Sequence, residues 1–306
     1  MVYTVGETVL DIIFKTIDDV KVKPGGSMLN TAVSLGRLGT NVFHISTMAT
    51  DKASDMLLTF LEQNGVNTKF IFRNNLIKTS LALAYLNEKN NAEYIFYKDK
   101  LEFQNKLAFP ELRKYDIVHY GSFFSINENM HAQLHVFLDK IGDRSVIKIY
   151  DPNFRKPHLP QLEQLKPMIE NNFMKADIVK GSNEDFENIY GINSGFEAWA
   201  ILQKFDVKVL FYTKGEKGSE FYCKKGKLDI ETHKINVVST IGAGDTYSAG
   251  IIYFLTSKLH ETVVLDEISL EQWRQCIKLA HDFSVQTCQS LDNYLSTEYC
   301  NSIKHV

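Results

Sequence analysis

The chain has 306 residues, of which 44% are hydrophobic and 23% are charged, a composition that suits one large α/β domain with its own core. Its formal net charge of −3 argues against a protein that binds nucleic acid by bulk electrostatics. The four cysteines form no CxxC pair, the first residues lack a secretory pattern, and no apolar run is long enough to span a membrane. We therefore expect a cytoplasmic, enzyme-sized protein without a membrane or nucleic-acid partner.

The first part of the chain predicts alternating strands and helices. Residues 2–5 form a short β-rich run typical of a buried strand, and residues 42–48 predict the next one. The small-residue face of residues 28–38 predicts a tightly packed helix, and residues 51–64 predict a second helix. This order is typical of an α/β protein.

The character of the sequence changes between residues 70 and 100. Three β-rich stretches follow one another without a helix between them, at residues 70–72, 80–86 and 93–97. This pattern is typical of an antiparallel meander. Residues 70–100 are therefore predicted to form a small antiparallel sheet.

Strands and helices alternate again after this stretch. The expected strands are residues 117–120, 146–150, 178–179 and 209–212, and the expected helices are residues 127–141, 162–174 and 196–205. Polar residues follow the strand ends, and ligands bind at this edge of a doubly wound parallel sheet. We therefore predict a single α/β domain, residues 1–306, with a doubly wound, mostly parallel sheet flanked by helices and a small separate β-sheet.

A turn of small residues, Gly242-Ala243-Gly244, lies between an expected strand at residues 235–238 and an expected buried helix at residues 247–255. Residues with almost no side chain let a ligand come close to their backbone N–H groups. The start of a helix also leaves N–H donors unpaired and carries partial positive charge. The turn is therefore a candidate phosphate site.

Asp245 follows this turn directly and allows two interpretations. A carboxylate would repel a bound phosphate unless it has a task, such as accepting the proton of a nucleophile that attacks the phosphate. Alternatively, Asp245 caps the helix N-terminus in a tight turn. The residues alone leave both roles open.

Two further stretches agree with phosphoryl transfer. Gly25 and Gly26 allow close backbone approach, while Asn30 and Asp11 offer an amide and a carboxylate for the hydroxyls of a small polyol. The loop at residues 213–218 is punctuated by glycine after an expected strand, which suits the ribose and phosphates of a nucleotide. The chain has neither a GxxxxGK[ST] loop nor the motifs of protein kinases.

These motifs together resemble the ribokinase-like carbohydrate kinases of the pfkB family. Residues 25–39 resemble the family's N-terminal signature, and residues 240–245 resemble its C-terminal signature. Residues 151–155 and 213–218 fall between them in the order that the family shows. The resemblance therefore covers nearly the whole chain. It implies a β-sheet lid formed by residues 70–100, where the small sheet is predicted, together with residues 11–23, which include an exposed strand.

The implied lid carries alternating apolar residues, such as Leu81, Leu83 and Tyr85. A lid with one face toward a ligand still has another face or edge to cover. Pairing with a second subunit is the simplest cover. We therefore expect a homodimer formed through the lids.

The resemblance implies an ATP-dependent kinase that transfers the γ-phosphate to a primary hydroxyl of a small sugar, with ATP and Mg²⁺ as co-substrates. It implies that Asp245 is the general base and that Gly242, Ala243 and Gly244 form the anion hole. The residues that it assigns to the sugar are Asp11, Gly25, Gly26, Asn30 and Arg155, and those assigned to the nucleotide are Thr213, Gly215, Gly218 and Ser182.

The chain also departs from the family pattern. Ser239 stands where an acidic residue is common, and Ile241 where Thr or Val is common, which argues against a monovalent-cation site. The family's Asn-x-x-Glu motif aligns with residues 182–185, so Asp185 becomes the candidate Mg²⁺ ligand. The serine at position 182 resembles fructokinase-like members and favours a fructose-like ketose.

Other interpretations stay open at this point. A nucleoside kinase of the adenosine type has the same fold, and a catalytically weak sugar- or nucleotide-binding regulator would keep the pocket. Arg155 could be a surface arginine after a turn. His119 ends an expected buried strand and is more typical of a packed core residue than of a catalyst.

Overall fold

The computed structural model describes residues 1–86, 92–99, 107–142, 145–258 and 264–304, so residues 87–91 and 100 of the expected lid lie outside the described residues. The chain divides into two compact units. The first unit contains Met1–Glu111, Ile235–Ala249 and Asp282–Val306, and the second contains Leu112–Lys234 and Gly250–His281. In the part that the structure describes, no helix is long and apolar enough to cross a membrane.

In the first unit, β4 (Val42–Ala49) is the strand on which the others are assembled. It pairs in parallel with β1 (Val2–Val5), β5 (Val66–Asn67) and β6 (Ile71–Asn74). Every residue of β1 is buried, as the continuous apolar run of a strand in a covered parallel sheet requires. The helices of this part are α1 (Ser27–Arg37) and α2 (Lys52–Gln63).

The expectation that residues 70–72 belong to an antiparallel meander was wrong. Strand β6 pairs in parallel with β4, with Ile71 opposite Ser46. Strand β5 pairs with the beginning of β4 and β6 with its end. The chain that returns from α2 therefore follows the edge of β4 along its length, as a βαβ connection does.

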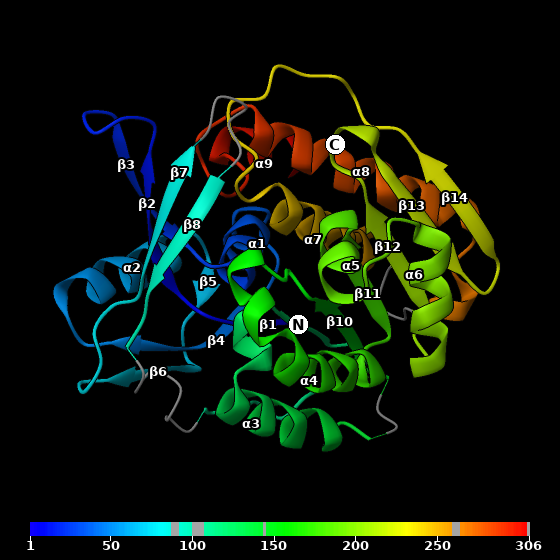
Figure 1. Ribbon diagram of the computed structural model, residues 1–306, viewed down its shortest axis with the longest axis horizontal. Helices are drawn as coiled ribbons and strands as arrows, with labels where there is room; N and C mark the ends of the chain where they lie inside the picture. Colours follow the sequence, from blue (N-terminus) through cyan, green and yellow to red (C-terminus); the bar gives the residue numbers. More distant parts are fainter. Residues whose placement is uncertain (87–91, 100–106, 143–144, 259–263, 305–306) are drawn as a thin grey trace. The chain divides into compact units, whose positions relative to one another are not determined.

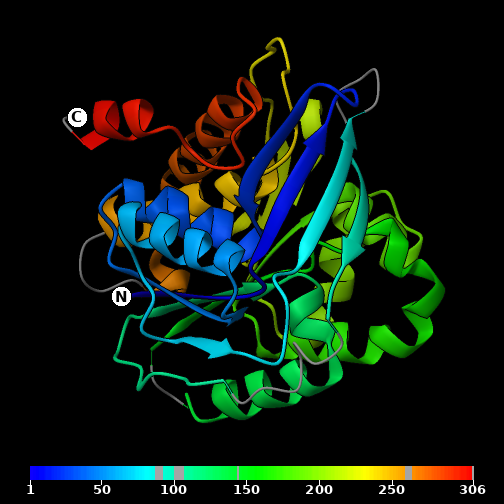
Figure 2. The same ribbon diagram turned by 90° about the vertical axis from the view of Figure 1, so that its left-hand side faces the viewer.

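A separate four-stranded sheet, sheet B, has the order β3-β2-β7-β8. Its strands are β2 (Val9–Phe14), β3 (Val20–Gly25), β7 (Leu81–Leu86) and β8 (Ala92–Tyr97). The two hairpins β2-β3 and β7-β8 are antiparallel, and β2 pairs with β7 in parallel. Figures 1 and 2 show these strands side by side. The predicted small sheet is therefore confirmed, with a parallel pair at its centre.

Residues 235–238 do not form the strand expected before the glycine-rich turn. Asn236 and Val237 are exposed, and Val238 N–H and Ser239 N–H donate to the carbonyl of Cys288. The β-branched side chains of this run have no sheet face to pack against, so their strand propensity is not realised. The turn leads into α7 (Ala243–Tyr253), which is followed by a short π-helical segment (Phe254–Lys258).

The second unit contains a sheet with the strand order β14-β13-β12-β11-β10-β9. Strands β9 (Ile117–Gly121), β10 (Ile147–Asp151), β11 (Ile178–Ser182) and β12 (Val209–Thr213) are parallel, and β13 (Ser219–Cys223) and β14 (Gly226–Ile230) continue the sheet as antiparallel strands. The mostly parallel character was predicted. Strands β13 and β14, which follow the glycine-punctuated loop as a hairpin, were not predicted.

The remaining helices match the expected ones within a few residues where a prediction was made. They are α3 (Glu128–Asp139), α4 (Leu162–Lys175), α5 (Asn183–Tyr190), α6 (Gly195–Leu202), α8 (Leu270–Cys288) and α9 (Thr297–Lys304). Helices α7 and α8 each begin in one unit and end in the other. Helices α5, α8 and α9 were not predicted.

Candidate active site

A stripe of polar side chains runs along the buried face of α1. Ser27, Asn30, Thr31 and Ser34 follow one another at the spacing that puts residues on one side of a helix. All four are at most 8% exposed. Buried polar side chains require hydrogen-bond partners, so this stripe indicates that a polar element lies against α1.

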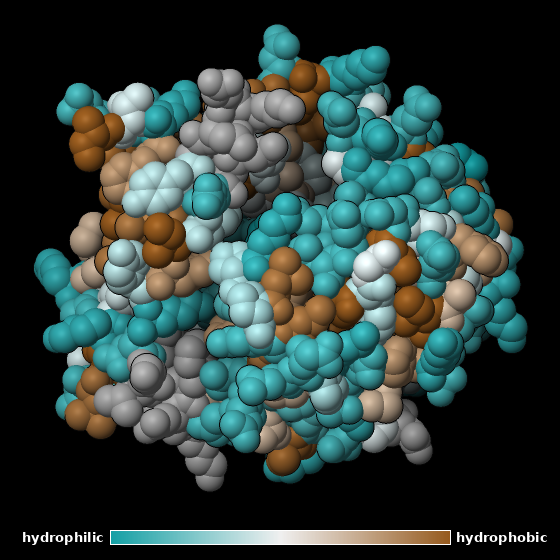
Figure 3. Space-filling view, viewed as in Figure 1, coloured by the Kyte–Doolittle hydropathy of each residue, from teal (hydrophilic) through white to brown (hydrophobic). Residues whose placement is uncertain are grey.

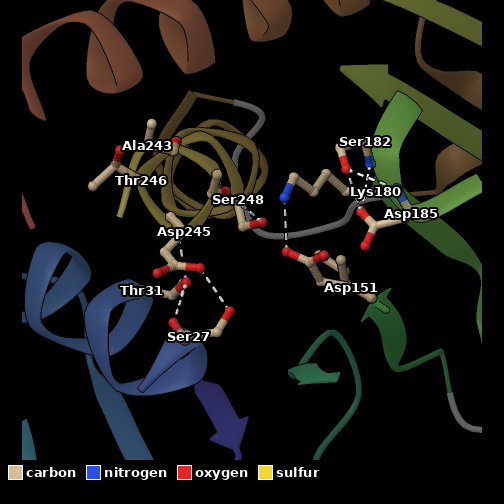
Figure 4. A network of polar contacts seen from close by, with 12 residues as sticks. Ser27, Thr31, Asp151, Lys180, Ser182, Asp185, Ala243, Asp245, Thr246 and Ser248 are labelled. Carbon is tan, nitrogen blue, oxygen red and sulfur yellow. Dashed lines mark hydrogen bonds and ion pairs between the residues drawn. The ribbon is translucent and has the colours of Figure 1, made fainter. Parts of the chain in front are cut away.

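That polar element is the first turn of α7. The Ser27 hydroxyl donates to Asp245 Oδ1 at 2.6 Å, and Asn30 Nδ2 donates to Asp245 Oδ2 at 2.8 Å. The Thr31 hydroxyl donates to the backbone carbonyl of Asp245 at 3.0 Å. Figure 4 shows Ser27 and Asp245 pointing toward one another. The polar stripe of α1 therefore fixes the orientation of one carboxylate.

Asp245 is the third residue of α7 and 8% exposed. Gly242 precedes the helix, and its carbonyl accepts the N–H of Thr246 at 2.9 Å. The N-cap position is therefore occupied by Gly242, and the alternative interpretation of Asp245 as an N-cap does not describe this helix. The carboxylate of Asp245 accepts from side chains of α1 instead.

The glycine-rich turn has a backbone conformation that depends on Gly242. Its φ of 79° lies in the left-handed region, where a residue with a Cβ is strained. A Cβ at this position would also overlap the backbone carbonyl of Asn293. The Ser284 hydroxyl donates to the Ala243 carbonyl at 2.7 Å. Ser284 and Asn293 thus hold the turn in place. Gly242, Ala243 and Gly244 are half-buried.

Asp11 lies in the same unit, on β2 of sheet B, and its side chain is buried. Its carboxylate packs so closely on Gly25 that a Cβ there would overlap it. Asn293 Nδ2 donates to Asp11 Oδ2 at 2.7 Å. The structure therefore brings two of the sequence-predicted residues, Asp11 and Gly25, into contact.

Gly26 packs against the protein backbone at the start of α1. It is the N-cap of α1 with a φ of 119°, and a Cβ there would overlap the Glu7 carbonyl. Gly26 is therefore needed to start the helix that carries Ser27 and Asn30. Its proposed contact with sugar stays a prediction.

The inner face of sheet B packs on the glycine-rich turn. Ile13 and Ala84 form a buried cluster with Ile241, and Tyr94 packs against this cluster. Ile241 immediately precedes Gly242. The predicted lid therefore packs on Ile241, the residue directly before the predicted anion hole.

In the second unit, Asp185 fastens a loop. Ser182 is the N-cap of α5, and Asp185 at the third position completes a capping box with it. Asp185 Oδ2 accepts from Ser182 N–H and from its hydroxyl, both at 2.7 Å, while Oδ1 accepts from Phe154 N–H at 2.7 Å. Figure 4 shows Ser182 and Asp185 turned toward each other. Asp185 thereby ties the loop after β10 to α5.

This arrangement leaves little room for a metal ion at Asp185. Three protein donors occupy three of the about four acceptor positions of the carboxylate, so one position remains, on Oδ1. Among the described residues, no group of three or more His, Cys, Asp or Glu side chains is arranged to hold a metal ion. The contacts give Asp185 a structural task, and its role as a Mg²⁺ ligand stays a prediction.

Arg155 follows the loop that Asp185 fastens and is exposed. In the same unit, Lys180 Nζ and Asp151 Oδ2 form an ion pair at 2.9 Å whose side chains are only 6% and 1% exposed (Figure 4). Asn153 has a φ of 41°, which is uncommon for a residue with a side chain. A strained loop held by a buried ion pair and Asp185 therefore carries Arg155, whose ligand contact stays a prediction.

The predicted nucleotide loop follows β12. Thr213 ends that strand, and Gly215 begins a short 3-10 turn with a φ of 58° and nothing within contact of an added Cβ. Gly218 packs its Cα on the Ile230 carbonyl of the neighbouring strand. Gly215 is therefore open to a ligand, whereas Gly218 is needed for the approach of β13 to β14.

His119 is a core residue. It is fully buried, and its Nδ1 lies 3.3 Å from the Ile149 carbonyl oxygen. Burial lowers the pKa of His119 to about 3, because desolvation disfavours the charged imidazolium. A histidine that stays neutral and buried agrees with the packing interpretation.

Two residues of this site were not singled out from the sequence. Ser27 entered only as part of residues 25–39, the stretch that resembles the family signature, although the polar stripe that it begins at helical spacing was a usable signal. Asn293 gave no local signal at all, because its partner Asp11 is 282 positions away. Such a pairing exists only in the folded chain.

Comparison with known proteins gives the chain its family. The model of the pfkB family of carbohydrate kinases matches residues 1–298. Probable fructokinase-6, chloroplastic, of Arabidopsis thaliana is 30% identical over 268 residues, which cover 85% of this chain and 68% of that protein. Probable fructokinase-4 of the same organism is 26% identical over 294 residues, covering 92% and 88%.

Solved structures share the fold. The fructokinase of Vibrio cholerae, bound to fructose, ADP and calcium, has a TM-score of 0.85 at 18% identity, covering 98% of this chain and 97% of that one. Aminoimidazole riboside kinase of Salmonella enterica has a TM-score of 0.83 at 17% identity, covering 99% of both chains. These likenesses confirm the predicted fold class, a ribokinase-like α/β fold with a small separate sheet. The chain therefore belongs to the pfkB family of carbohydrate kinases, phosphotransferases with an alcohol group as acceptor.

Proposed function

We propose that this enzyme transfers the γ-phosphate of ATP to a primary hydroxyl of a small, fructose-like sugar. One observation carries the proposal: the buried Asp245 carboxylate, directly after the glycine-rich turn, is held by Ser27 and Asn30. A carboxylate offers about four acceptor positions. These two donors occupy one on each oxygen, so acceptor positions remain for the proton of a substrate hydroxyl.

The proposed reaction follows from this arrangement. Asp245 accepts the proton of the sugar O–H, and the sugar oxygen forms a bond to the γ-phosphorus as the bond to the ADP oxygen breaks. The backbone N–H groups of Gly242, Ala243 and Gly244 stabilise the charge on the transferred phosphoryl group. Phosphoryl transfer of this kind relies on positioning and electrostatics, which the contacts of α1 with α7 would supply.

ATP is the proposed phosphoryl donor. A structural neighbour from Pyrococcus horikoshii, a sugar kinase with 21% identity and a TM-score of 0.78, was solved in complex with ATP. We place the nucleotide along Thr213, Gly215, Gly218 and Ser182. Mg²⁺ would accompany the phosphates and neutralise part of their charge, and a ligand role of Asp185 stays a prediction. We place the enzyme in the cytoplasm, since its four cysteines are widely spaced and form no CxxC pair.

Fructose is the proposed substrate because the curated relatives above are fructokinases. A nucleoside is the second candidate, favoured by the riboside kinase among the structural neighbours. A coupled assay of ADP release with fructose, ribose, tagatose, 2-keto-3-deoxygluconate, adenosine and aminoimidazole riboside separates the two. Highest kcat/KM with a nucleoside would replace the sugar proposal, and no acceptor-dependent turnover would indicate a weak binding protein.

Replacing Asp11 with Ala should raise the KM for the sugar about tenfold or more and leave the KM for ATP within twofold. A small polyol has little apolar surface, so its affinity depends on hydrogen bonds to charged groups, each worth about 1.5–3 kcal/mol. A loss of about 1.4 kcal/mol already corresponds to a factor of ten. Steady-state kinetics with each substrate varied in turn give the two values. Equal shifts in both would indicate that Asp11 supports the fold, and no shift would remove it from the sugar site.

The outer face of sheet B supports the proposal of a homodimer. Strand register aligns Val22, Ile12, Leu83 and Ile95 across all four strands. Val22 is 55% exposed and Ile95 is 48% exposed. Figure 3 shows apolar surface gathered over these strands. Exposed, contiguous apolar patches mark interaction sites, and a second copy of the same face is the occupant that we propose.

Replacing Ile95 with Asp should convert the proposed dimer into a monomer, because the pairing of two lids would then bury two uncompensated charges. Light scattering at micromolar concentration measures the mass. The matched control is Phe196→Asp on α6, where an apolar side chain is 68% exposed outside sheet B. A monomeric wild-type protein, or an Ile95→Asp variant that remains dimeric, would contradict the proposed interface.

A further inference from the structure

The loop between α8 and α9, residues 289–296, is anchored at two of its residues, Asp292 and Leu295. Lys23 Nζ and Asp292 Oδ1 form an ion pair at 2.5 Å, which ties the loop to β3. Leu295 N–H donates to the Ser34 hydroxyl at 3.2 Å, and Arg37 Nη1 donates to the Leu295 carbonyl at 2.6 Å. The loop is therefore fixed to sheet B on one side and to α1 on the other.

Asn293 lies between these two anchors and is fully buried. Its side-chain Nδ2 donates to Asp11 Oδ2 at 2.7 Å. Its backbone carbonyl packs on Gly242, where a Cβ would overlap it. One residue thus touches both the carboxylate proposed for the sugar and the turn proposed for the phosphate.

The side chain of Asn293 suits donation to Asp11 in particular. Its Oδ1 is buried and accepts no hydrogen bond from any residue that the structure describes. An unsatisfied buried acceptor is unfavourable, and the hydrogen bond that Nδ2 donates to Asp11 offsets part of this cost. Hydrogen bonds to an ionised acceptor are short and directional. The Asp11 carboxylate also packs on Gly25, so Asn293 and Gly25 both constrain its orientation.

We propose that Asn293 is a positioning residue for sugar binding. Its amide holds Asp11 Oδ2, which orients the carboxylate so that its remaining acceptor positions meet the sugar hydroxyls. Its backbone packs on the Gly242 turn. The sugar and the phosphate are thereby held in a fixed position relative to each other. The inference rests on the proposed sugar-kinase function and on the role of Asp11 in it.

The test compares Asn293→Asp and Asn293→Ala with Asp11→Ala and the double variant Asp11→Ala/Asn293→Ala. Asp has the size and shape of Asn, so Asn293→Asp keeps the packing on Gly242 but replaces the donor with a like charge beside Asp11. We expect it to raise the sugar KM about tenfold or more, with the ATP KM within twofold. Asn41→Asp, an exposed position of the same unit, is the matched control and should match wild type.

The double-mutant cycle separates positioning from packing, because residues that act through one contact give non-additive effects. If Asn293 acts through Asp11, then Asn293→Ala should have less than a twofold further effect on the sugar KM in the Asp11→Ala background. Additive effects, or a sugar KM of Asn293→Asp within twofold of wild type, would overturn the proposal. If Asn293→Asp fails to fold by circular dichroism, the Ala cycle decides. Failure of the proposed function is seen separately, as absence of sugar-dependent turnover in wild type.

Discussion

Replacing Asp245 with Asn should lower kcat by about 10²- to 10⁴-fold, the usual contribution of a positioned general base. Asn keeps the size of the side chain and can still accept a hydrogen bond from Ser27 or Asn30, which hold Asp245 at 2.6 and 2.8 Å. It cannot accept the proton of the sugar hydroxyl. The KM values for sugar and ATP should therefore change little, and steady-state kinetics with both substrates measure the effect.

The control for this variant is Asp55→Asn. Asp55 is a largely exposed residue of α2 that pairs with Arg73 at 2.6 Å, and surface ion pairs of this kind contribute little to stability. This variant should keep wild-type kcat. If the Asp245→Asn enzyme retains more than a third of wild-type kcat, Asp245 is not the base, and the proposed mechanism fails while the family membership stands.

Replacing Gly242 with Ala should both destabilise the protein and abolish most of its activity. The added Cβ meets two obstacles, the left-handed φ of 79° and the Asn293 carbonyl. Strain of this kind amounts to about 1–3 kcal/mol, and the overlap adds to it because Asn293 is itself anchored by its pairing with Asp11. Urea unfolding gives the free energy, and the ADP-release assay gives kcat.

Gly191→Ala is the matched control for this prediction. Gly191 ends α5 with a φ of 70°, and nothing lies within 4 Å of an added Cβ. It therefore reports backbone strain without overlap, which amounts to about 1 kcal/mol for such a position. Gly242→Ala should be the more destabilising of the two and the only one that loses turnover. Equal destabilisation, or normal turnover by Gly242→Ala, would show that the turn can relax without harm.

Local patterns were sufficient to predict most of the strands and helices and the residues nearest the chemistry. Gly242 to Asp245 are adjacent in sequence, and a small-residue turn before a helix has a direct physical meaning. Asp11 and Gly25 could be proposed because a carboxylate suits the hydroxyls of a small polyol and a glycine allows close backbone approach. The structure places them in contact on sheet B. The sequence alone did not predict this contact.

What the sequence could not supply depends on contacts between distant residues. Residues 235–238 pair with no strand that the structure describes, and Val238 N–H donates to the Cys288 carbonyl instead. Strand β6 joins β4 because the chain returns along that edge. The amide of Asn30 donates to Asp245, a contact that was not predicted, while its assignment to the sugar stays a prediction. The partners of Ser27 and Asn293 are more than 200 positions away. Only tertiary packing assigns these roles.

The most direct test of the account is to identify the product of wild-type enzyme with fructose and ATP by phosphorus NMR. The account predicts one new phosphomonoester resonance that couples to the two protons of a primary CH₂ group, formed in equal amount to ADP and absent with the Asp245→Asn variant. Inorganic phosphate as the only product, or no phosphorylated sugar from any acceptor in the screen, would contradict it.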